Sequence, residues 1–144
     1  MNLLEIGILV FVIIEFLNIL MLYWNPGSKK GNGVGVFNAY EEAKENTKVF
    51  SLIEYLINWV AGAKLIFIMI GIVVIIFGNY YTQLFTVVAL IISIASFYFR
   101  LFPIIKTLDN KGEITPQGYA RTLNYMILSF MAGFVIILII SLID

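Results

Sequence analysis

The stretch FVIIEFLNIL, Phe11 to Leu20, lies inside a longer apolar run from Leu3 to Tyr23. The run is close to the roughly 20 residues that a helix needs to cross ~30 Å of hydrocarbon. Its apolar residues are continuous rather than alternating, which favours a helix over a membrane strand. One carboxylate, Glu15, and one amide, Asn18, interrupt it. The stretch therefore predicts a membrane-spanning helix that carries a costly charge.

The composition of the whole chain agrees with a lipid environment. Of the 144 residues, 61% are hydrophobic and 12% are charged, about half the charged fraction of an ordinary soluble domain. Nine basic and nine acidic residues cancel, and we expect no nucleic-acid partner. Histidine and cysteine are absent. Their absence excludes disulfides, thiolate and imidazole metal sites and histidine acid–base catalysis, and we expect no metal.

Four apolar runs of this kind predict an all-α fold. We expect one transmembrane domain over residues 1–144, a polytopic four-helix bundle with spans at about 3–23, 60–78, 84–102 and 123–143. Apolar residues at helical spacing predict an unbroken amphipathic helix at about 39–58 on the inner surface. The third helix should continue past Arg100 with a kink near Pro103. Thr115 and Pro116 should begin the fourth.

The basic residues predict how the chain is threaded. None lies at the N-terminal tip, in the short connection Asn79–Gln83, or at the C-terminal tip. All nine fall on one side of the predicted membrane: Lys29, Lys30, Lys44, Lys48, Lys64, Arg100, Lys106, Lys111 and Arg121. Since loops rich in Lys and Arg remain in the cytoplasm, we expect a multi-pass protein of the cell membrane. Both termini lie outside and two loops lie in the cytoplasm.

Two charged residues are predicted to lie at a similar depth in the membrane. Counted from the outer end at 1.5 Å per residue, Glu15 lies about 18 Å deep and Lys64 about 21 Å deep. Opposite charges at similar depth predict an ion pair, which relieves most of the cost of burying each charge. The alternatives are that Lys64 extends to the nearby surface and that Glu15 is a protonated carboxyl bonded to another helix.

Further polar residues gather in the same cytoplasmic half of the spans. The third span carries small or hydroxylated side chains along one face from Thr82 to Arg100. Such a face is typical of close helix packing, and the alternative is the wall of a polar pathway. The predicted intramembrane polar centre comprises Glu15, Asn18, Lys64, Ser93, Ser96, Arg100 and Asn124.

Three short pieces of the chain resemble the MAPEG family, the membrane-associated proteins of eicosanoid and glutathione metabolism. They are FNAYEEAKEN at Phe37–Asn46, WVAG at Trp59–Gly62 and QGYAR at Gln117–Arg121. That family is similar in length and has four spans. The resemblance implies trimers that bind glutathione between subunits near the cytoplasm. On matching positions it places Asn46 and Tyr119 against glutathione, with Arg121 beside them.

Three positions depart from that family's pattern. Glu42 stands where a basic residue is expected, Val49 where an acidic residue is expected, and Met126 where the thiol-activating arginine is expected. The catalytic motif is thus incomplete. The resemblance implies the same scaffold rather than glutathione transfer.

Two functions follow from these patterns. The first is a non-enzymatic transport, channel or membrane-complex subunit with a buried polar centre, including a purely structural partner subunit. The alternative is a MAPEG-like enzyme or carrier that holds a lipophilic substrate, with or without glutathione as cofactor, near Asn46, Tyr119 and Arg121. The expected partners are the lipid bilayer and either further copies of the chain or another membrane protein.

Overall fold

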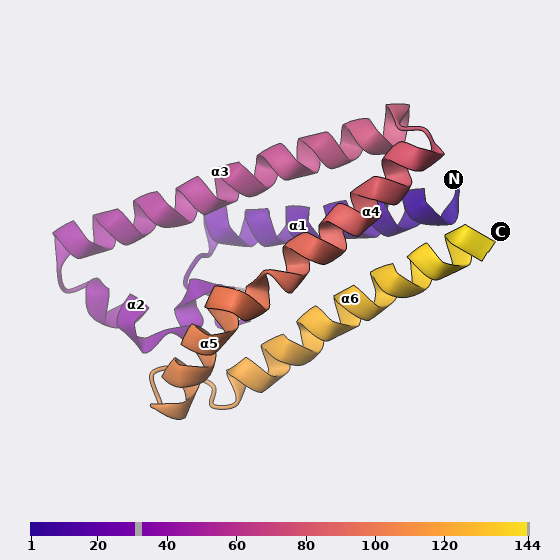
Figure 1. Ribbon diagram of the computed structural model, residues 1–144. Coiled ribbons are helices and arrows are strands. Elements are labelled where there is room, and N and C mark those ends of the chain that lie inside the picture. The colour runs from indigo at the N-terminus through magenta and orange to yellow at the C-terminus, as the bar shows by residue number, and fades with distance from the viewer. Residues whose placement is uncertain (31–32, 144) are drawn as a thin grey trace.

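The computed structural model describes residues 1–30 and 33–143. Over these residues the chain is mostly helical, and Figure 1 shows long helical rods that run between two ends of the molecule. The elements in order are α1 (Leu3–Trp24), the 3-10 turn η1 (Val34–Val36), α2 (Asn38–Ala43), α3 (Thr47–Phe77), α4 (Tyr80–Ala95), α5 (Phe97–Asn110) and α6 (Tyr119–Ile143).

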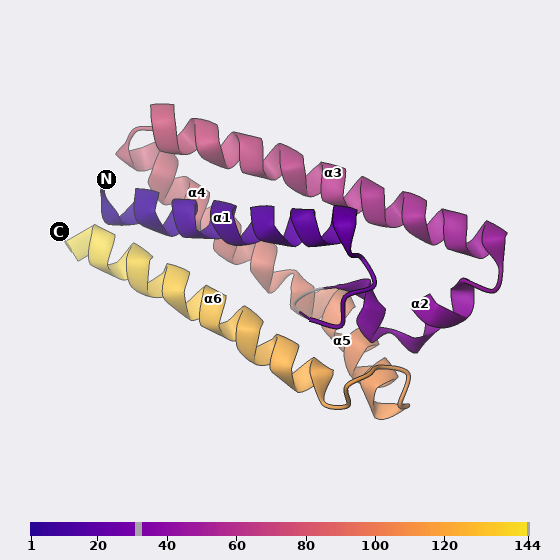
Figure 2. The same cartoon turned by 180° about the vertical axis from the view of Figure 1, so that it is seen from behind.

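Four segments are long and apolar enough to cross a membrane. They are Leu3–Trp24, Thr47–Phe77, Tyr80–Asn110 and Tyr119–Ile143. The prediction of an all-helical chain with four helices long and apolar enough to span a membrane is therefore confirmed over the described residues. The N-terminus, the C-terminal end of α6 and the α3–α4 turn lie together at one end of the molecule (Figures 1 and 2). The longer connections lie at the other end.

Three predicted helix boundaries are wrong. The segment 39–58 is not one helix, because α2 ends at Ala43 and α3 begins at Thr47. The Asn46 side chain accepts hydrogen bonds from the backbone N–H groups of Lys48 and Val49. An asparagine that caps in this way starts a new helix.

The other two differences concern the break in the third helix and the start of the last helix. The third helix continues past Arg100 to Asn110, as predicted, but its break lies at Ser96, between α4 and α5, whereas Pro103 lies inside α5. The Ser96 hydroxyl donates to the Ser93 carbonyl, a bond that competes with the helix ladder. The last helix begins at Tyr119 and not at Pro116, since Gly118 has a φ of +83°. The Asp109 carboxylate accepts from Gly118 N–H and Ala120 N–H and so caps α6 from outside.

The two long connections are joined to each other. Phe37 and Ile114 form an antiparallel bridge, and Thr115 N–H donates to the Val36 carbonyl at 2.8 Å. The Asn38 side chain donates to the Gly112 carbonyl at 3.0 Å and accepts from the Thr115 hydroxyl at 2.9 Å. These bonds pair backbone and side-chain polar groups of the two connections and hold both connections at one end of the bundle.

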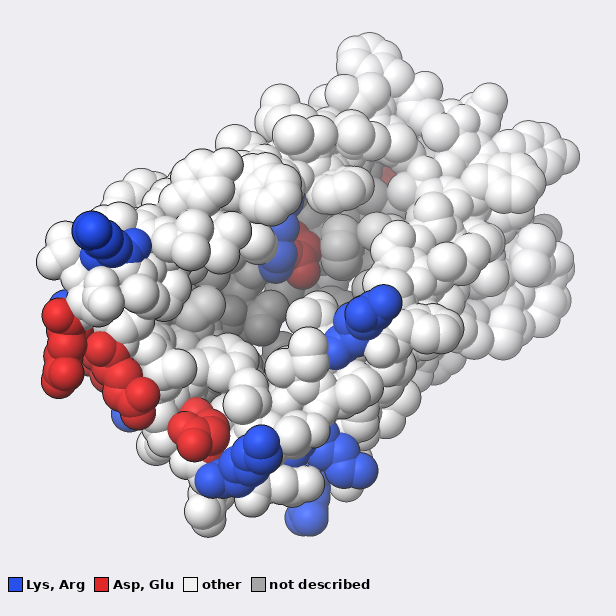
Figure 3. Space-filling view, turned by 60° about the vertical axis from the view of Figure 1, so that its left-hand side comes forward, with Lys and Arg blue, Asp and Glu red and all other residues white. Residues whose placement is uncertain are grey.

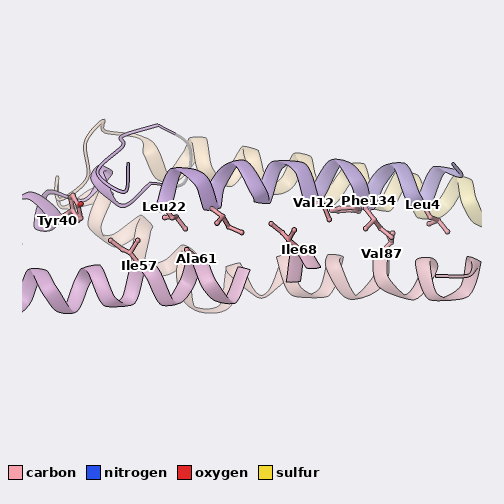
Figure 4. Packing of buried hydrophobic residues seen from close by; sticks show 11 residues of the cluster. Leu4, Val12, Leu22, Tyr40, Ile57, Ala61, Ile68, Val87 and Phe134 are labelled. Carbon is pink, nitrogen blue, oxygen red and sulfur yellow. The ribbon is translucent and has the colours of Figure 1, made fainter. Parts of the chain in front are cut away.

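The apolar core has two parts. The larger runs between α1 and α3 and reaches α4 and α6 through Val87 and Phe134; Figure 4 shows its side chains in a row along the two helices. The smaller one lies at the loop end, where Val36, Ile114 and Leu123 pack against α5. The helices α1 and α3 pack closely because Gly71 has no side chain: a Cβ there would lie 2.8 Å from Val12 Cγ2.

Candidate functional site

A charged triad joins α1 to α3. Lys64 Nζ lies 2.7 Å from Glu15 Oε2 and 2.6 Å from Asn18 Oδ1. Both distances are those of short, charge-assisted hydrogen bonds. The ion pair that the depth estimate predicts is thus present in the structure. Lys64 does not extend to the surface, and Glu15 bonds to Lys64 instead of to another group.

The local sequence explains why these three residues meet. Glu15 and Asn18 are three residues apart on α1, so they lie on one face of that helix. Lys64 lies on α3, seven residues before Gly71, and therefore on the face of α3 that packs against α1. The side chains of Lys64 and Glu15 remain 25% and 28% exposed. The pair is thus reachable from a surface of the molecule.

That surface is a hollow between α1, α3 and α4. The two helices α3 and α4 separate as they leave their turn (Figure 1), and the space between them has a volume of about 470 Å³. Glu15 and Lys64 line it, together with Thr86, Ala89 and Ser93 of α4. Figure 3 shows the molecule hollowed on one face, with a basic and an acidic group in contact inside the hollow.

A second cavity reaches the triad from the opposite side. It lies between α1, α6 and the end of α4, has a volume of about 300 Å³, and is lined by Glu15 and Asn18. Its other lining residues include Ile94, Leu123 and Met126. Glu15 therefore borders two cavities, and the triad lies between them rather than in a close-packed core.

The remaining residues of the predicted polar centre are dispersed. Ser93 lines the hollow, whereas Ser96 lies at the break between α4 and α5 and donates to Ser93 O at 2.6 Å. Arg100 is exposed on α5, and Asn124 is half-buried on α6. Neither Arg100 nor Asn124 lines one of the three cavities described for this chain. The structure thus gathers Glu15, Asn18, Lys64 and Ser93 and leaves the others apart.

The small face of α4 does not pack against another helix of the chain. Thr86, Ala89 and Ser93 line the hollow instead, and the Thr86 hydroxyl donates to the Thr82 carbonyl of its own helix at 2.7 Å. On α6, Ser129 and Gly133 line a third cavity, of about 590 Å³, against α1. Within the described residues this part of the α4 face forms the wall of a cavity, and its close packing against a neighbouring helix stays a prediction.

The residues named by the family resemblance do not form one pocket. Asn46 caps α3, Tyr119 is buried in the smaller core, and Arg121 is exposed at the start of α6. None of the three lines a cavity described for this chain. Within the described residues there is also no group of three or more carboxylate, histidine or cysteine side chains that could hold a metal.

Sequence reasoning missed a polar cluster at the end that carries the termini. Gln83 is 1% exposed. Its amide donates to Glu5 Oε1 and to the Gly78 carbonyl, both at 3.0 Å, and its oxygen accepts from Asn2 Nδ2 at 2.7 Å. Asn2 and Glu5 also form the capping box of α1. The capping pattern was readable in the sequence, but the partner on α4 was not.

Chemically, the triad offers hydrogen-bonding groups at the edge of an apolar space. Lys64 uses two of its three N–H donors in the triad, and Glu15 Oε1 has no hydrogen-bond partner among residues 1–30 and 33–143. One donor and one acceptor therefore remain for a ligand. The described part of the chain presents no nucleophile paired with a base in either cavity that the triad borders.

Four apolar spans around a charged triad define the class: a small helical membrane protein. Comparison of the chain with family models, with curated proteins and with solved structures found no match.

Proposed function

We propose that the chain is a non-enzymatic subunit of a membrane transport, channel or multi-protein assembly, and that its working centre is the triad of Glu15, Asn18 and Lys64. The observation that carries the proposal is that Glu15 borders a cavity on each side. A purely structural role explains the pair less well, because the cost of desolvating two charges can exceed their attraction and well-packed apolar residues often stabilise as much. A pair flanked by open space is typical of intramembrane groups that meet a substrate or an ion.

The proposal includes the threading of the chain through the cell membrane, with both termini outside. It is supported by the position of the basic residues and by the hydrogen bonds that hold the two Lys- and Arg-bearing connections at one end. The chain has no cysteine, so a single introduced cysteine is its only site for maleimide labelling. In intact cells, a membrane-impermeant maleimide should label Tyr81→Cys and should label Lys111→Cys only after permeabilisation. The reverse pattern contradicts the threading.

Association with further copies or with another membrane protein is part of the same proposal. In the 18-residue apolar stretch of Tyr80–Asn110, only 6% of the residues are buried within the chain, and the share is the same in Tyr119–Ile143. Small residues such as Gly133, which has nothing within 4 Å of a built Cβ, allow close approach of a neighbouring helix. Light scattering of the purified protein in detergent should give a mass above one chain plus its micelle. A monomeric mass contradicts self-association.

Flux through reconstituted liposomes tests the role of the triad. A panel of proton and alkali-cation gradients is set across the bilayer, and dissipation is compared for the wild type, Glu15→Gln and empty liposomes. We expect dissipation above that of empty liposomes, and its loss in Glu15→Gln. Ala132→Leu is the control, because Ala132 is exposed on α6 and lines none of the described cavities. Equal rates in the wild type and Glu15→Gln contradict a working role for the triad.

A further inference from the structure

The hollow between α1, α3 and α4 has a polar end and an apolar end. Glu15, Lys64 and Ser93 lie at one end, whereas Ile8, Gly71 and Thr86 line the other. On each helix the two ends are seven residues apart, which corresponds to about 10 Å along the helix axis. The volume of about 470 Å³ falls within the range of about 300–1,000 Å³ that is usual for small-molecule sites.

The polar end accepts an uncharged headgroup better than a charged one. Lys64 and Glu15 neutralise each other at 2.7 Å, so the polar end presents no net charge to the headgroup of a ligand. A ligand carboxylate or ammonium would have to displace one member of the pair and leave it unpaired, which is strongly unfavourable. A hydroxyl instead donates to Glu15 Oε1 and accepts from the remaining Lys64 N–H, and the pair stays intact.

The rest of the hollow fits a hydrocarbon chain. Its lining outside the polar end is apolar apart from Thr86, whose hydroxyl is already bonded to the Thr82 carbonyl. Phe67 and Ile70, on the α3 side, are 68% and 54% exposed, so the hollow opens sideways between α3 and α4. In a bilayer this opening faces lipid, and a ligand enters from the membrane without crossing water.

We propose that this hollow binds a single-chain amphiphile with an uncharged, hydroxyl-bearing headgroup. The headgroup lies on Glu15 Oε1 and Lys64 Nζ, and the chain extends toward Ile8 and Gly71. The inference rests on the proposed function, since it assigns a ligand class to the same triad. A helix of a second copy is the competing occupant, and the test separates the two.

The test uses the full-length protein in phosphatidylcholine nanodiscs and a monodecanoylglycerol that carries a photoreactive diazirine in its chain. Labelling is quantified and mapped by mass spectrometry, with unlabelled monodecanoylglycerol, decanoate and decylamine as competitors. We expect saturable labelling of α3 and α4 on the hollow, with monodecanoylglycerol as the best competitor. Better competition by decanoate or decylamine overturns the choice of an uncharged headgroup.

A second test uses a variant that fills part of the hollow. Ala89→Leu places a larger side chain in the hollow and should weaken labelling at least about fivefold, because overpacking is costly. Ala132→Leu makes the same substitution on an exposed face of α6 and should leave labelling unchanged. Unchanged labelling in Ala89→Leu overturns the proposal. So does an Ala89→Leu variant that becomes monomeric with no loss of labelling, since the hollow then holds a second copy.

The flux experiment keeps this proposal distinct from the proposed function. Loss of flux in Glu15→Gln without saturable labelling overturns the ligand and leaves the working role of the triad standing. Saturable labelling at the hollow with equal flux in the wild type and Glu15→Gln supports the ligand, and it overturns transport through the triad.

Discussion

Lys64 Nζ lies 2.7 Å from Glu15 Oε2, and this contact joins two helices whose facing side chains are otherwise almost all apolar. Asn18 Oδ1 accepts a second hydrogen bond from the same ammonium group at 2.6 Å. The two carboxylate and amide acceptors come from one face of α1, and the donor comes from α3. The triad thus joins α1 to α3, and Glu15 borders two cavities.

Removing either charge should destabilise the protein. Glu15→Gln or Lys64→Met leaves one charged group without its partner inside the spans, and we expect each to cost about 1–3 kcal/mol. The double variant should be more stable than the sum of the two single effects predicts, because no uncompensated charge remains. The measurement is the free energy of unfolding in detergent micelles. Lys48→Met is the control, since Lys48 is exposed. Strictly additive effects would show that the two side chains do not interact.

A methyl group at Gly71 should force α1 and α3 apart. Its Cβ would lie 2.8 Å from Val12 Cγ2, and a β-branched valine has little freedom to turn away in a helix. We expect Gly71→Ala to lower the melting temperature. Gly62→Ala, on the same helix, meets only the Tyr23 hydroxyl at 3.9 Å and should be neutral or stabilising by up to about 1 kcal/mol through helix propensity. An equal gain in both variants would contradict the close contact.

Gln83 should hold the start of α1 against α4. Gln83→Leu leaves the amide of Asn2 without its acceptor and removes the donor to Glu5, and we expect a cost of about 1–3 kcal/mol. Hydrogen exchange in the first turn of α1 should become faster. Gln117→Leu, at an exposed position, is the matched control. Unchanged exchange in Gln83→Leu would show that the capping box of α1 is sufficient alone.

The hydroxyl of Tyr98 offers a test of opposite sign. This buried oxygen has no hydrogen-bond partner among the described residues, although its ring packs against Phe97 and Phe102. Tyr98→Phe keeps the ring contacts and removes an unsatisfied polar group, so we expect a gain in stability of about 1 kcal/mol. Tyr125→Phe, with Tyr125 63% exposed, should change little. A loss of stability in Tyr98→Phe would indicate that the hydroxyl bonds to a molecule from the membrane or to another chain.

Part of the candidate site can be predicted from the sequence alone. Glu15 and Lys64 stand out because each interrupts an apolar run, and counting residues along two helices of fixed rise places them at similar depth. Gln83 could not be found in this way. It lies beside the predicted span rather than inside it, and its partners Asn2 and Glu5 are far from it in the chain.

Local signals failed where a distant group decided the outcome. Thr115 and Pro116 have the pattern of a helix start, yet α6 begins at Tyr119 because Asp109, on α5, caps the N–H groups of Gly118 and Ala120. The small face of α4 has the pattern of a packing interface, yet it lines a hollow because α3 and α4 separate beyond their turn. In both cases the outcome depends on how two segments lie relative to each other, and the sequence of neither segment encodes that arrangement locally.

The sequence by itself determined that the chain forms four apolar helices and that two of them carry opposite charges at one depth. The reason is that hydrophobic length and helical rise are local properties of a segment. Only the tertiary structure decided which faces meet. The angle between packed helices sets where space remains, and this placed Glu15 and Lys64 between two cavities instead of inside a closed core.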